Sequence, residues 1–409
     1  MNYLNYQKNS LIHKFYLLLS LFLISLIFSC TFGSSNANDP MGCAIDNMSF
    51  AGRETPKVVI RADGTTLIDG EPFFPLGFYH IPSRADTGTK ITEINTLRDI
   101  SATGFNTLYA AVTNSVDDYE RLLDEAEKLG VYVISANISD RDTIEIVNMF
   151  KNKPAVLGWR IADDVGSTKE KHTPDGVLDL HCRVKKADPN HLTYISGGNS
   201  KRIPPFVNTA DAVAVQAYPV GHKNDLPISW ANQFTSVAHH SATEHRLIIA
   251  NTQAFQWSED RGDNVPTYEE VRNMSYQSLL AGAKGIIYYA YYDGDWYLPE
   301  HSDLWSGIQS LAPEIKQLSP ILLNGKLTQL NTSEENVLSG IWTYQDEALV
   351  MVVSTDRDET KKVSIPLSKE NIHQEKLISS DSASDLIFQD GKANVSLDPL
   401  DVKLYKFNI

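Results

Sequence analysis

The feature that most constrains the fold is an alternation of short apolar segments with longer stretches of helical periodicity, repeated between residues 73 and 290. Each apolar segment has the length of a buried strand. Strands that alternate with helices form parallel sheets covered by those helices. The expected strands number eight: Phe73–Tyr79, Asn106–Val112, Val131–Ala136, Val156–Ile161, Leu192–Ser196, Ala212–Ala217, Leu247–Gln253 and Gly285–Ala290.

This pattern predicts a (β/α)8 barrel, because eight strand–helix units over about 250 residues match that fold. The rival, an open doubly wound sheet, usually carries a glycine-rich phosphate loop, and no such fingerprint follows any expected strand. The clearest helices are expected at Asp117–Leu129 and at Tyr268–Ala283, with Thr267 as the N-cap of the second. A hairpin around Ala62-Asp63-Gly64 precedes the first strand and is expected to close the bottom of the barrel.

The pattern changes beyond Asn324 to alternating apolar and polar residues without helical stretches. Segments of this kind predict a small antiparallel β-sandwich. We therefore expect a barrel domain over residues 57–323 and a sandwich domain over residues 324–409. The clearest strands of the second domain are expected at Gly340–Tyr344, Ala348–Ser354, Lys362–Leu367 and Val402–Phe407.

The N-terminus has the pattern of an export signal. Lys8 and Lys14 precede an apolar run, Phe15–Phe28, which is shorter than a typical membrane-spanning helix. The run ends in Ser29-Cys30, which resembles the bacterial lipoprotein box, so residues 1–30 are predicted to be a signal ending at a lipidated (palmitate-bearing) Cys30, and residues 31–56 a tether. The resemblance implies a lipid-anchored protein of the bacterial cell envelope. Thr31, rather than Asp, follows the cysteine, which favours the outer membrane, on its periplasmic or its surface face. The alternative interpretation is an ordinary cleaved signal with an incidental cysteine.

The net charge and the cysteine content of the chain limit which binding partners and metal sites are expected. The formal net charge of -15 disfavours nucleic acid and an anionic membrane surface as partners of the folded body. Cys43 and Cys182 could pair, but their spacing suits no zinc site. We expect no metal and no cofactor, and contact with the membrane through the lipid anchor only. The sequence leaves the oligomeric state open.

Candidate functional residues follow the expected strands, because the C-terminal ends of barrel strands carry the active sites of this fold. They are mostly carboxylates, amides and aromatic residues, with few Lys or Arg. Such side chains suit sugar rings and their hydroxyls better than a phosphorylated metabolite. The candidates are His80, Trp159, Asp163, Asp164, Asn199, Tyr218, Gln253, Trp257, Glu259, Asp293, Asp295 and Trp296.

Several motifs resemble, in their order, the barrel glycosidases of the clan that includes cellulases and β-galactosidases. These motifs are Pro75–Tyr79, Gly104–Thr107, Gly158–Asp164, Gln253–Trp257 and Gly282–Tyr289. The resemblance covers about residues 57 to 300 and lies in the order of the motifs rather than in close identity. It implies a glycoside hydrolase with a carbohydrate substrate.

The resemblance also implies roles for the carboxylates. In that clan the end of strand four carries the acid/base, normally a Glu after Asn or Asp, and the matching position is Asp164 after Asp163. A paired acidic site raises one carboxyl pKa, which suits an acid catalyst. The alternative is that both aspartates bind backbone or a nearby arginine such as Arg160. The nucleophile of strand seven is replaced by Gln253, so Glu259 or Asp293 is expected as the second carboxylate.

The remaining candidates are predicted to contact the substrate. Trp257 and Trp296 are favoured as stacking platforms, and Asn199, Gln253 and Asp295 as hydrogen-bonding residues. For Trp159 and Tyr218 the alternative is packing at the barrel rim, and for His80 a structural hydrogen bond. We expect hydrolysis of O-glycosidic bonds in an extracellular oligo- or polysaccharide. The alternative function is that of a non-catalytic glycan-binding surface lipoprotein on the same fold.

Overall fold

A computed structural model describes residues 41–43, 56–82, 93–109, 115–135, 142–168, 171–221, 226–257, 264–367, 374–377 and 386–409. The chain divides into two compact units, Met1–Phe50 and Ala51–Ile409, and the second is described below. The predicted signal and Cys30 lie outside the described residues. Within the described part, no helix combines the length and the apolar character needed to cross a bilayer. Cys43 and Cys182, whose pairing the sequence leaves open, are each disulfide-bonded.

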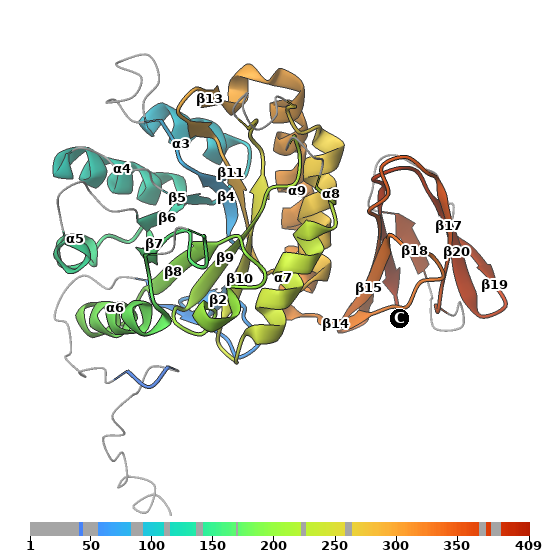
Figure 1. Ribbon diagram of the computed structural model, residues 1–409, viewed down its shortest axis with the longest axis horizontal. Helices are drawn as coiled ribbons and strands as arrows, with labels where there is room; N and C mark the ends of the chain where they lie inside the picture. Colours follow the sequence, from blue (N-terminus) through green and yellow to red (C-terminus); the bar gives the residue numbers. More distant parts are fainter. Residues whose placement is uncertain are drawn as a thin grey trace, which may run out of the picture. The chain divides into compact units, whose positions relative to one another are not determined.

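Eight parallel strands close into a barrel, as the sequence predicts (Figure 1). Each strand pairs with the next along the chain, and the last pairs with the first through Ile286↔Leu76 and its neighbours. All eight predicted strands are present, and four of them are shorter than expected. They are β4 (Leu76–Tyr79), β5 (Thr107–Tyr109), β6 (Tyr132–Ser135), β7 (Val156–Ala162), β8 (Leu192–Gly197), β9 (Ala212–Ala217), β10 (Leu247–Gln253) and β11 (Ile286–Tyr289).

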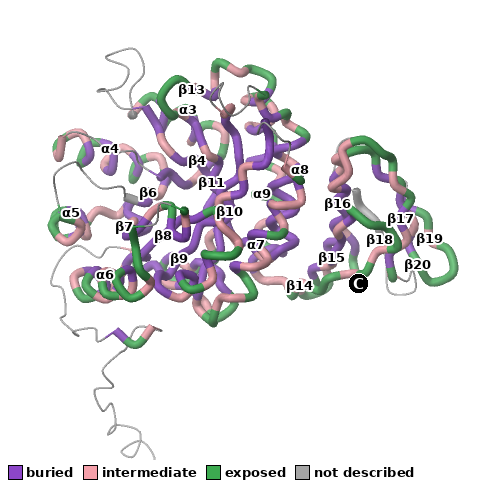
Figure 2. Tube along the Cα trace, viewed as in Figure 1, coloured by how far each residue is buried: buried purple, intermediate pink, exposed green. Residues whose placement is uncertain are grey.

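Helices cover the outside of the barrel and bury their inward faces against it (Figure 2). The expected N-cap is confirmed, because the Thr267 side chain accepts a hydrogen bond from the backbone N–H of Glu270, which in turn caps the backbone of Thr267. The helices are α3 (Glu93–Ala102), α4 (Val116–Leu129), α5 (Thr143–Phe150), α6 (Pro174–Ala187), α7 (Trp230–Ser241), α8 (Tyr268–Leu280) and α9 (Ser302–Asn324).

The barrel interior is filled by side chains from alternate positions of the strands. On β9 and β10, for example, Ala212, Ala214, Leu247 and Ile249 belong to this inner cluster. Strand β7 departs from simple alternation, because its pairing register shifts after Val156 and again after Arg160. A shift of this kind is a β-bulge, and it changes which side chains face the interior.

A three-stranded antiparallel sheet closes the bottom of the barrel, as expected from the Asp-Gly hairpin. It consists of β1 (Val58–Ile60), β2 (Thr66–Ile68) and β3 (Glu71–Phe73). Val58, Ile60 and Ile68 join the apolar cluster of the barrel interior. The backbone N–H of Val58 also donates to the carbonyl of Asn190, just before β8.

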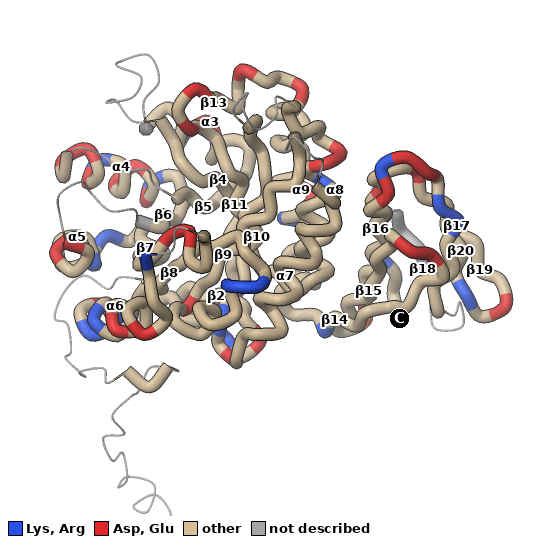
Figure 3. Tube along the Cα trace, in the orientation of Figure 1, with Lys and Arg blue, Asp and Glu red and all other residues tan. Residues whose placement is uncertain are grey.

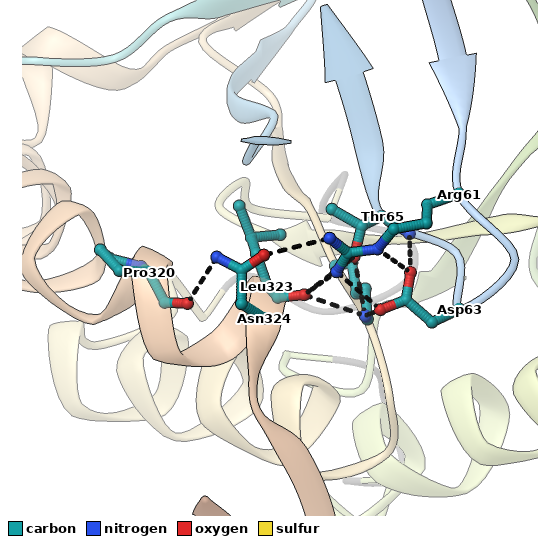
Figure 4. Close-up of polar contacts among 7 residues, drawn as sticks. Arg61, Asp63, Thr65, Pro320, Leu323 and Asn324 are labelled. Atoms are coloured by element: carbon teal, nitrogen blue, oxygen red, sulfur yellow. Dashed lines mark hydrogen bonds and ion pairs between the residues drawn. The ribbon is translucent and has the colours of Figure 1, made fainter. Parts of the chain in front are cut away.

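A polar network joins this sheet to the end of α9 (Figure 4). Arg61 Nη2 donates to the Leu323 carbonyl at 2.6 Å, and Thr65 Oγ1 donates to the same oxygen at 3.0 Å. Lys284 Nζ donates to Asp63 Oδ2 at 2.9 Å. Burial alone would raise the pKa of Asp63, but its hydrogen bonds from Arg61 and Lys284 hold that pKa well below the ordinary value. Cations and donors therefore stabilise the carbonyl end of α9.

The C-terminal part forms the two sheets of the predicted β-sandwich. The five-stranded sheet has the order β14-β15-β16-β21-β18, and the three-stranded sheet has the order β17-β20-β19. Val350 and Val352 of the first sheet pack with Val363 and Ile365 of the second. The strands are β14 (Lys326–Gln329), β15 (Val337–Tyr344), β16 (Glu347–Ser354), β17 (Lys361–Ile365), β18 (Gln374–Leu377), β19 (Ile387–Gln389), β20 (Lys392–Leu397) and β21 (Val402–Asn408).

The outer face of the five-stranded sheet packs on the barrel through α8. Leu349, Met351 and Val353 alternate with the sandwich residues of β16 and belong to the same apolar cluster as the barrel helices. Asn273 on α8 donates to the carbonyls of Ser354 and Leu400, both at 2.8 Å. The sandwich is therefore part of the barrel's hydrophobic core and not a separately tethered module.

Candidate functional site

A cavity of about 1140 Å³ opens at the C-terminal ends of the barrel strands. The hairpin β12–β13 (Tyr292–Asp293 and Trp296–Tyr297), which follows β11, contributes to its wall. Lys, Arg, Asp and Glu lie mostly on helices and connecting segments, while the barrel strands carry almost none (Figure 3). The cavity is lined by Tyr79, His80, Asp163, Asp164, Gln216, Tyr218, Phe255, Gln256, Trp257, Tyr289, Asp293, Asp295 and Trp296.

Asp163 is held in place by four donors. Tyr79 Oη donates to its Oδ2 at 2.9 Å and Arg160 Nη1 to the same atom at 3.0 Å. The Ser196 hydroxyl and the backbone N–H of Asp164 both donate to Oδ1. These donors come from β4, β7 and β8, so this carboxylate ties three strands together at the mouth. The contact with Arg160 matches the structural alternative raised for this aspartate.

Asp164 follows Asp163 and is exposed on the cavity wall. Its backbone lies in the left-handed region with φ of 54°, a conformation that Asp tolerates better than most residues. The hydrogen bond from its N–H to Asp163, and the one from the Ser167 N–H to its carbonyl, fix this turn. The strained turn presents the Asp164 side chain to the cavity, and strain of this kind gathers at functional sites.

Asp164 follows β7 and Asp293 follows β11, and these two strands are four apart in either direction around the barrel. Tyr289 Oη donates to Asp293 Oδ2 at 2.7 Å, and His80 Nδ1 lies 3.7 Å from Oδ1. The neighbouring imidazole is the largest influence on the pKa of Asp293 and lowers it below the ordinary value; partial burial opposes this, and the Tyr289 hydroxyl adds to the lowering. Asp293 is therefore a stabilised carboxylate.

Aromatic rings form one wall of the cavity. Tyr218 stacks on Tyr289 with the ring centroids 5.5 Å apart, and it meets Phe255 edge to face at 5.2 Å. Trp257 packs edge to face on Phe255 at 4.9 Å. Trp296 also borders the cavity, but its indole is buried, donates to the Ala290 carbonyl and stacks on His301. His301 therefore covers one face of the indole, and the stacking-platform role of Trp296 stays a prediction.

Gln253 ends β10 but does not line the cavity. It is fully buried, and its side chain pairs with backbone on both sides: Nε2 donates to the carbonyls of Val220 and Phe255 at 2.8 and 3.1 Å, while Oε1 accepts from the Val220 N–H at 2.9 Å. The expected substrate contact is therefore corrected. Gln253 holds in place the segments that carry Tyr218 and Phe255.

Two further candidates lie away from the cavity lining. Trp159 is buried against α6, and its Nε1 donates to Asp188 at 2.7 Å, because the bulge in β7 turns this side chain outward. Trp159 is therefore a packing residue, but it packs outside the barrel beside Asp188 and His191 and not at the rim, as the alternative supposed. Asn199 closes a turn by accepting from the backbone N–H of Lys201. Glu259 lies outside the described residues, so its proposed role stays a prediction.

Five residues that line the cavity were not predicted from the sequence: Tyr79, Gln216, Phe255, Gln256 and Tyr289. Strand alternation could have found some of them. Gln216 and Tyr218 continue the inward face of Ala212 and Ala214, and Tyr289 continues that of Ile287. Phe255 and Gln256 follow the end of β10, where strand alternation no longer predicts which way a side chain points.

Comparison with known proteins gives a likeness of fold. No family model and no curated protein matches the sequence. Among solved structures, a glycoside hydrolase family 5 protein from Bacteroides vulgatus aligns with a TM-score of 0.60 and 13% identity over 88% of this chain and 95% of that one. An α-amylase from Geobacillus thermoleovorans, solved with acarbose, aligns with a TM-score of 0.55 and 12% identity over 82% and 98%. The chain thus has the barrel-plus-sandwich fold found in glycoside hydrolases.

Gln253→Glu tests whether this position is structural. A carboxylate would offer no proton to the Val220 and Phe255 carbonyls and would be buried without a cation, so we expect a loss of about 2–4 kcal/mol in the free energy of unfolding at pH 8. Urea unfolding measures it. Gln317→Glu, at an exposed position of α9, serves as the control and should change stability by less than about 0.5 kcal/mol. Equal stability of the two variants would refute the structural role.

Proposed function

We propose that the protein is a glycoside hydrolase that cleaves O-glycosidic bonds of an oligo- or polysaccharide held in the barrel mouth. The observation that carries the proposal is that Asp164 and Asp293 follow two opposite barrel strands, β7 and β11, and line one cavity with an aromatic wall. Glycoside hydrolysis uses two carboxyl groups that flank the scissile bond, and aromatic faces suit the apolar faces of sugar rings. The shared fold with glycoside hydrolases of known structure supports the proposal.

The two carboxyl groups have different surroundings, which supports different roles. Asp293 is stabilised as a carboxylate by His80 and Tyr289, as a base or nucleophile requires. Asp164 comes from the strand-four end, next to the fixed carboxylate of Asp163, and we assign it the proton donor. Asp163 has its oxygens occupied by donors from three strands, so its part is to position Asp164.

Exchanging either carboxyl for an amide tests these roles. Asp164→Asn and Asp293→Asn should each lower the release of reducing ends from the active glycan by about 100-fold or more, because a positioned acid or base contributes at least that factor. Affinity measured by calorimetry should stay near that of the wild type. Asp179→Asn, at an exposed position of α6, is the control. Full activity in both active-site variants would exclude this pair as the catalytic carboxyls.

The pKa of Asp293 gives a second test. Tyr289→Phe removes a hydrogen bond that favours the ionised carboxylate, so the pKa of Asp293 should rise toward its ordinary value. The acidic limb of the kcat/KM profile should then move to higher pH, because activity requires the ionised form. Tyr288→Phe is the matched control, since Tyr288 is the preceding residue and packs outside the barrel. If the acidic limb of the kcat/KM profile of Tyr289→Phe stayed at the wild-type pH, the role of Asp293 as base would be contradicted.

A non-catalytic glycan-binding protein is the second candidate, and one observation favours it. Gln253 occupies the strand-seven position that carries the nucleophile in the clan that the sequence resembles, and its amide is fully engaged with backbone. Measuring both binding and the release of reducing ends on a panel of plant, algal and microbial glycans separates the two candidates. Binding of one glycan without release of reducing ends by the wild type would favour the binding protein.

We further propose that the protein is exported and anchored through Cys30. The disulfide-bonded state of Cys43 and Cys182 supports an oxidising compartment, because disulfides persist outside the cytoplasm. Cys30→Ala should abolish incorporation of a labelled palmitate analogue and release the protein from the membrane fraction. Unchanged labelling of the variant would refute the anchor, and Ser29→Ala, which keeps a small residue before the cysteine, should label like the wild type.

A further inference from the structure

Tyr218 differs from the other tyrosines that line the cavity. Tyr79 donates to Asp163 at 2.9 Å and Tyr289 donates to Asp293 at 2.7 Å. The hydroxyl of Tyr218 is buried, and it has no hydrogen-bond partner within the described part of the chain. A buried hydroxyl without a partner is less stable than one that is paired, because it has lost its hydrogen bonds to water. Tyr218 lines the cavity, so a ligand oxygen that reaches this hydroxyl from there would supply the missing partner.

The ring of Tyr218 is held rigidly, so its hydroxyl is preorganised. It packs against Phe255 and Tyr289, and Gln253 fixes the following Val220 through two hydrogen bonds to the backbone. Gln216 lies on the inward side of β9, in line with Ala212 and Ala214, and Tyr218 continues that face just after the strand.

The surroundings decide what can pair with this hydroxyl. Burial, and then the neighbouring Tyr289 and Tyr194, together with the charges of Asp163 and Asp164, raise the pKa of Tyr218 well above its ordinary value, so the group stays protonated and donates. Among the described residues that line the cavity none is Lys or Arg, whereas four are Asp. An anionic acceptor would be repelled by these carboxylates, and an uncharged oxygen would not.

We propose that Tyr218 is the specificity-determining donor of this cavity, and that it hydrogen-bonds an uncharged oxygen of a neutral sugar. The ligand is then a neutral glycan rather than a uronate or a sulfated sugar. This inference rests on the proposed function in one respect only, that a glycan occupies the barrel mouth. It holds equally for a hydrolase and for a binding protein, because it concerns binding and not bond cleavage.

Calorimetry with neutral and uronate-containing oligosaccharides of matched length tests the inference on the full-length protein. To measure affinity without turnover, the Asp164→Asn background is used throughout. The neutral glycan should bind at least about tenfold more tightly than its uronate counterpart. Tyr218→Phe should lower the affinity for the neutral glycan by about 5- to 30-fold, the range expected for the loss of one hydrogen bond to a ligand.

Thermal unfolding distinguishes a ligand-binding role of the Tyr218 hydroxyl from a role in packing. Phe keeps the ring and removes only the unpaired hydroxyl, so Tyr218→Phe should melt at the same temperature as its parent or higher. Tyr288→Phe is the matched control: its hydroxyl lies 3.3 Å from Ser275 Oγ, away from the cavity, so the change should leave affinity unaltered. A lower melting temperature with unchanged affinity in the Tyr218 variant would make this tyrosine a packing residue and overturn the inference.

The remaining outcomes are also decisive. Tighter binding of the uronate glycan would overturn the inference that the ligand is neutral. An unchanged affinity of Tyr218→Phe for the neutral glycan would overturn the inference that Tyr218 donates to the ligand. Neither outcome would contradict the proposed function. Absence of binding to any glycan in the panel would instead reject the proposed function and this inference together.

Discussion

Closure of the strand ring is the constraint on which the rest of the structure depends. The pairing of β11 with β4 leaves no free edge, so the interior becomes one continuous packed core and every strand ends at the same rim. Side chains from strands far apart in sequence then converge on a single mouth. Asp164 and Asp293 are 129 residues apart in the chain (293 minus 164), yet both line the same cavity.

Two polar residues turn that rim into a defined cavity. Asp163 gathers donors from β4, β7 and β8, and Gln253 clamps the segments after β9 and β10 through backbone hydrogen bonds. Each has its hydrogen-bonding capacity occupied by the protein, so neither is a good partner for a ligand. Their effect is to preorganise the residues beside them: Asp164 next to Asp163, and Tyr218 and Phe255 around Gln253. Preorganised groups contact a ligand with less loss of entropy.

Hydrogen bonds also fix the parts of the barrel away from the mouth, at its bottom and on the side that packs against the sandwich. Arg61, Thr65 and Lys284 join the bottom sheet to the end of α9, and Asn273 joins α8 to the sandwich. Since β16 is buried on both faces, the sandwich and the barrel share one core. The tyrosine, histidine and carboxylate groups at the rim are therefore carried by strands whose outer helices are fixed in turn.

Periodicity was sufficient to predict all eight barrel strands, the bottom hairpin, the capped helix α8 and the change to a sandwich near Asn324, because these follow from local alternation and capping. Location after a strand also placed His80, Tyr218 and Trp257 at the cavity. Short strands such as β19, and the lining residues Phe255 and Gln256 after β10, carry no such period and were missed.

Which side chains face the cavity was decided by tertiary structure. A bulge in β7 turns Trp159 outward and Arg160 inward, and a bulge is a property of how two strands pair rather than of either sequence. In the same way Gln253 has the sequence position of a catalytic residue, but the carbonyls of Val220 and Phe255 occupy its amide. The sequence by itself determined the elements, their order and the residue types at the rim. The tertiary structure decided which of these residues the protein keeps for its own hydrogen bonds and which it leaves to a ligand, because that depends on donors and acceptors brought together from distant strands.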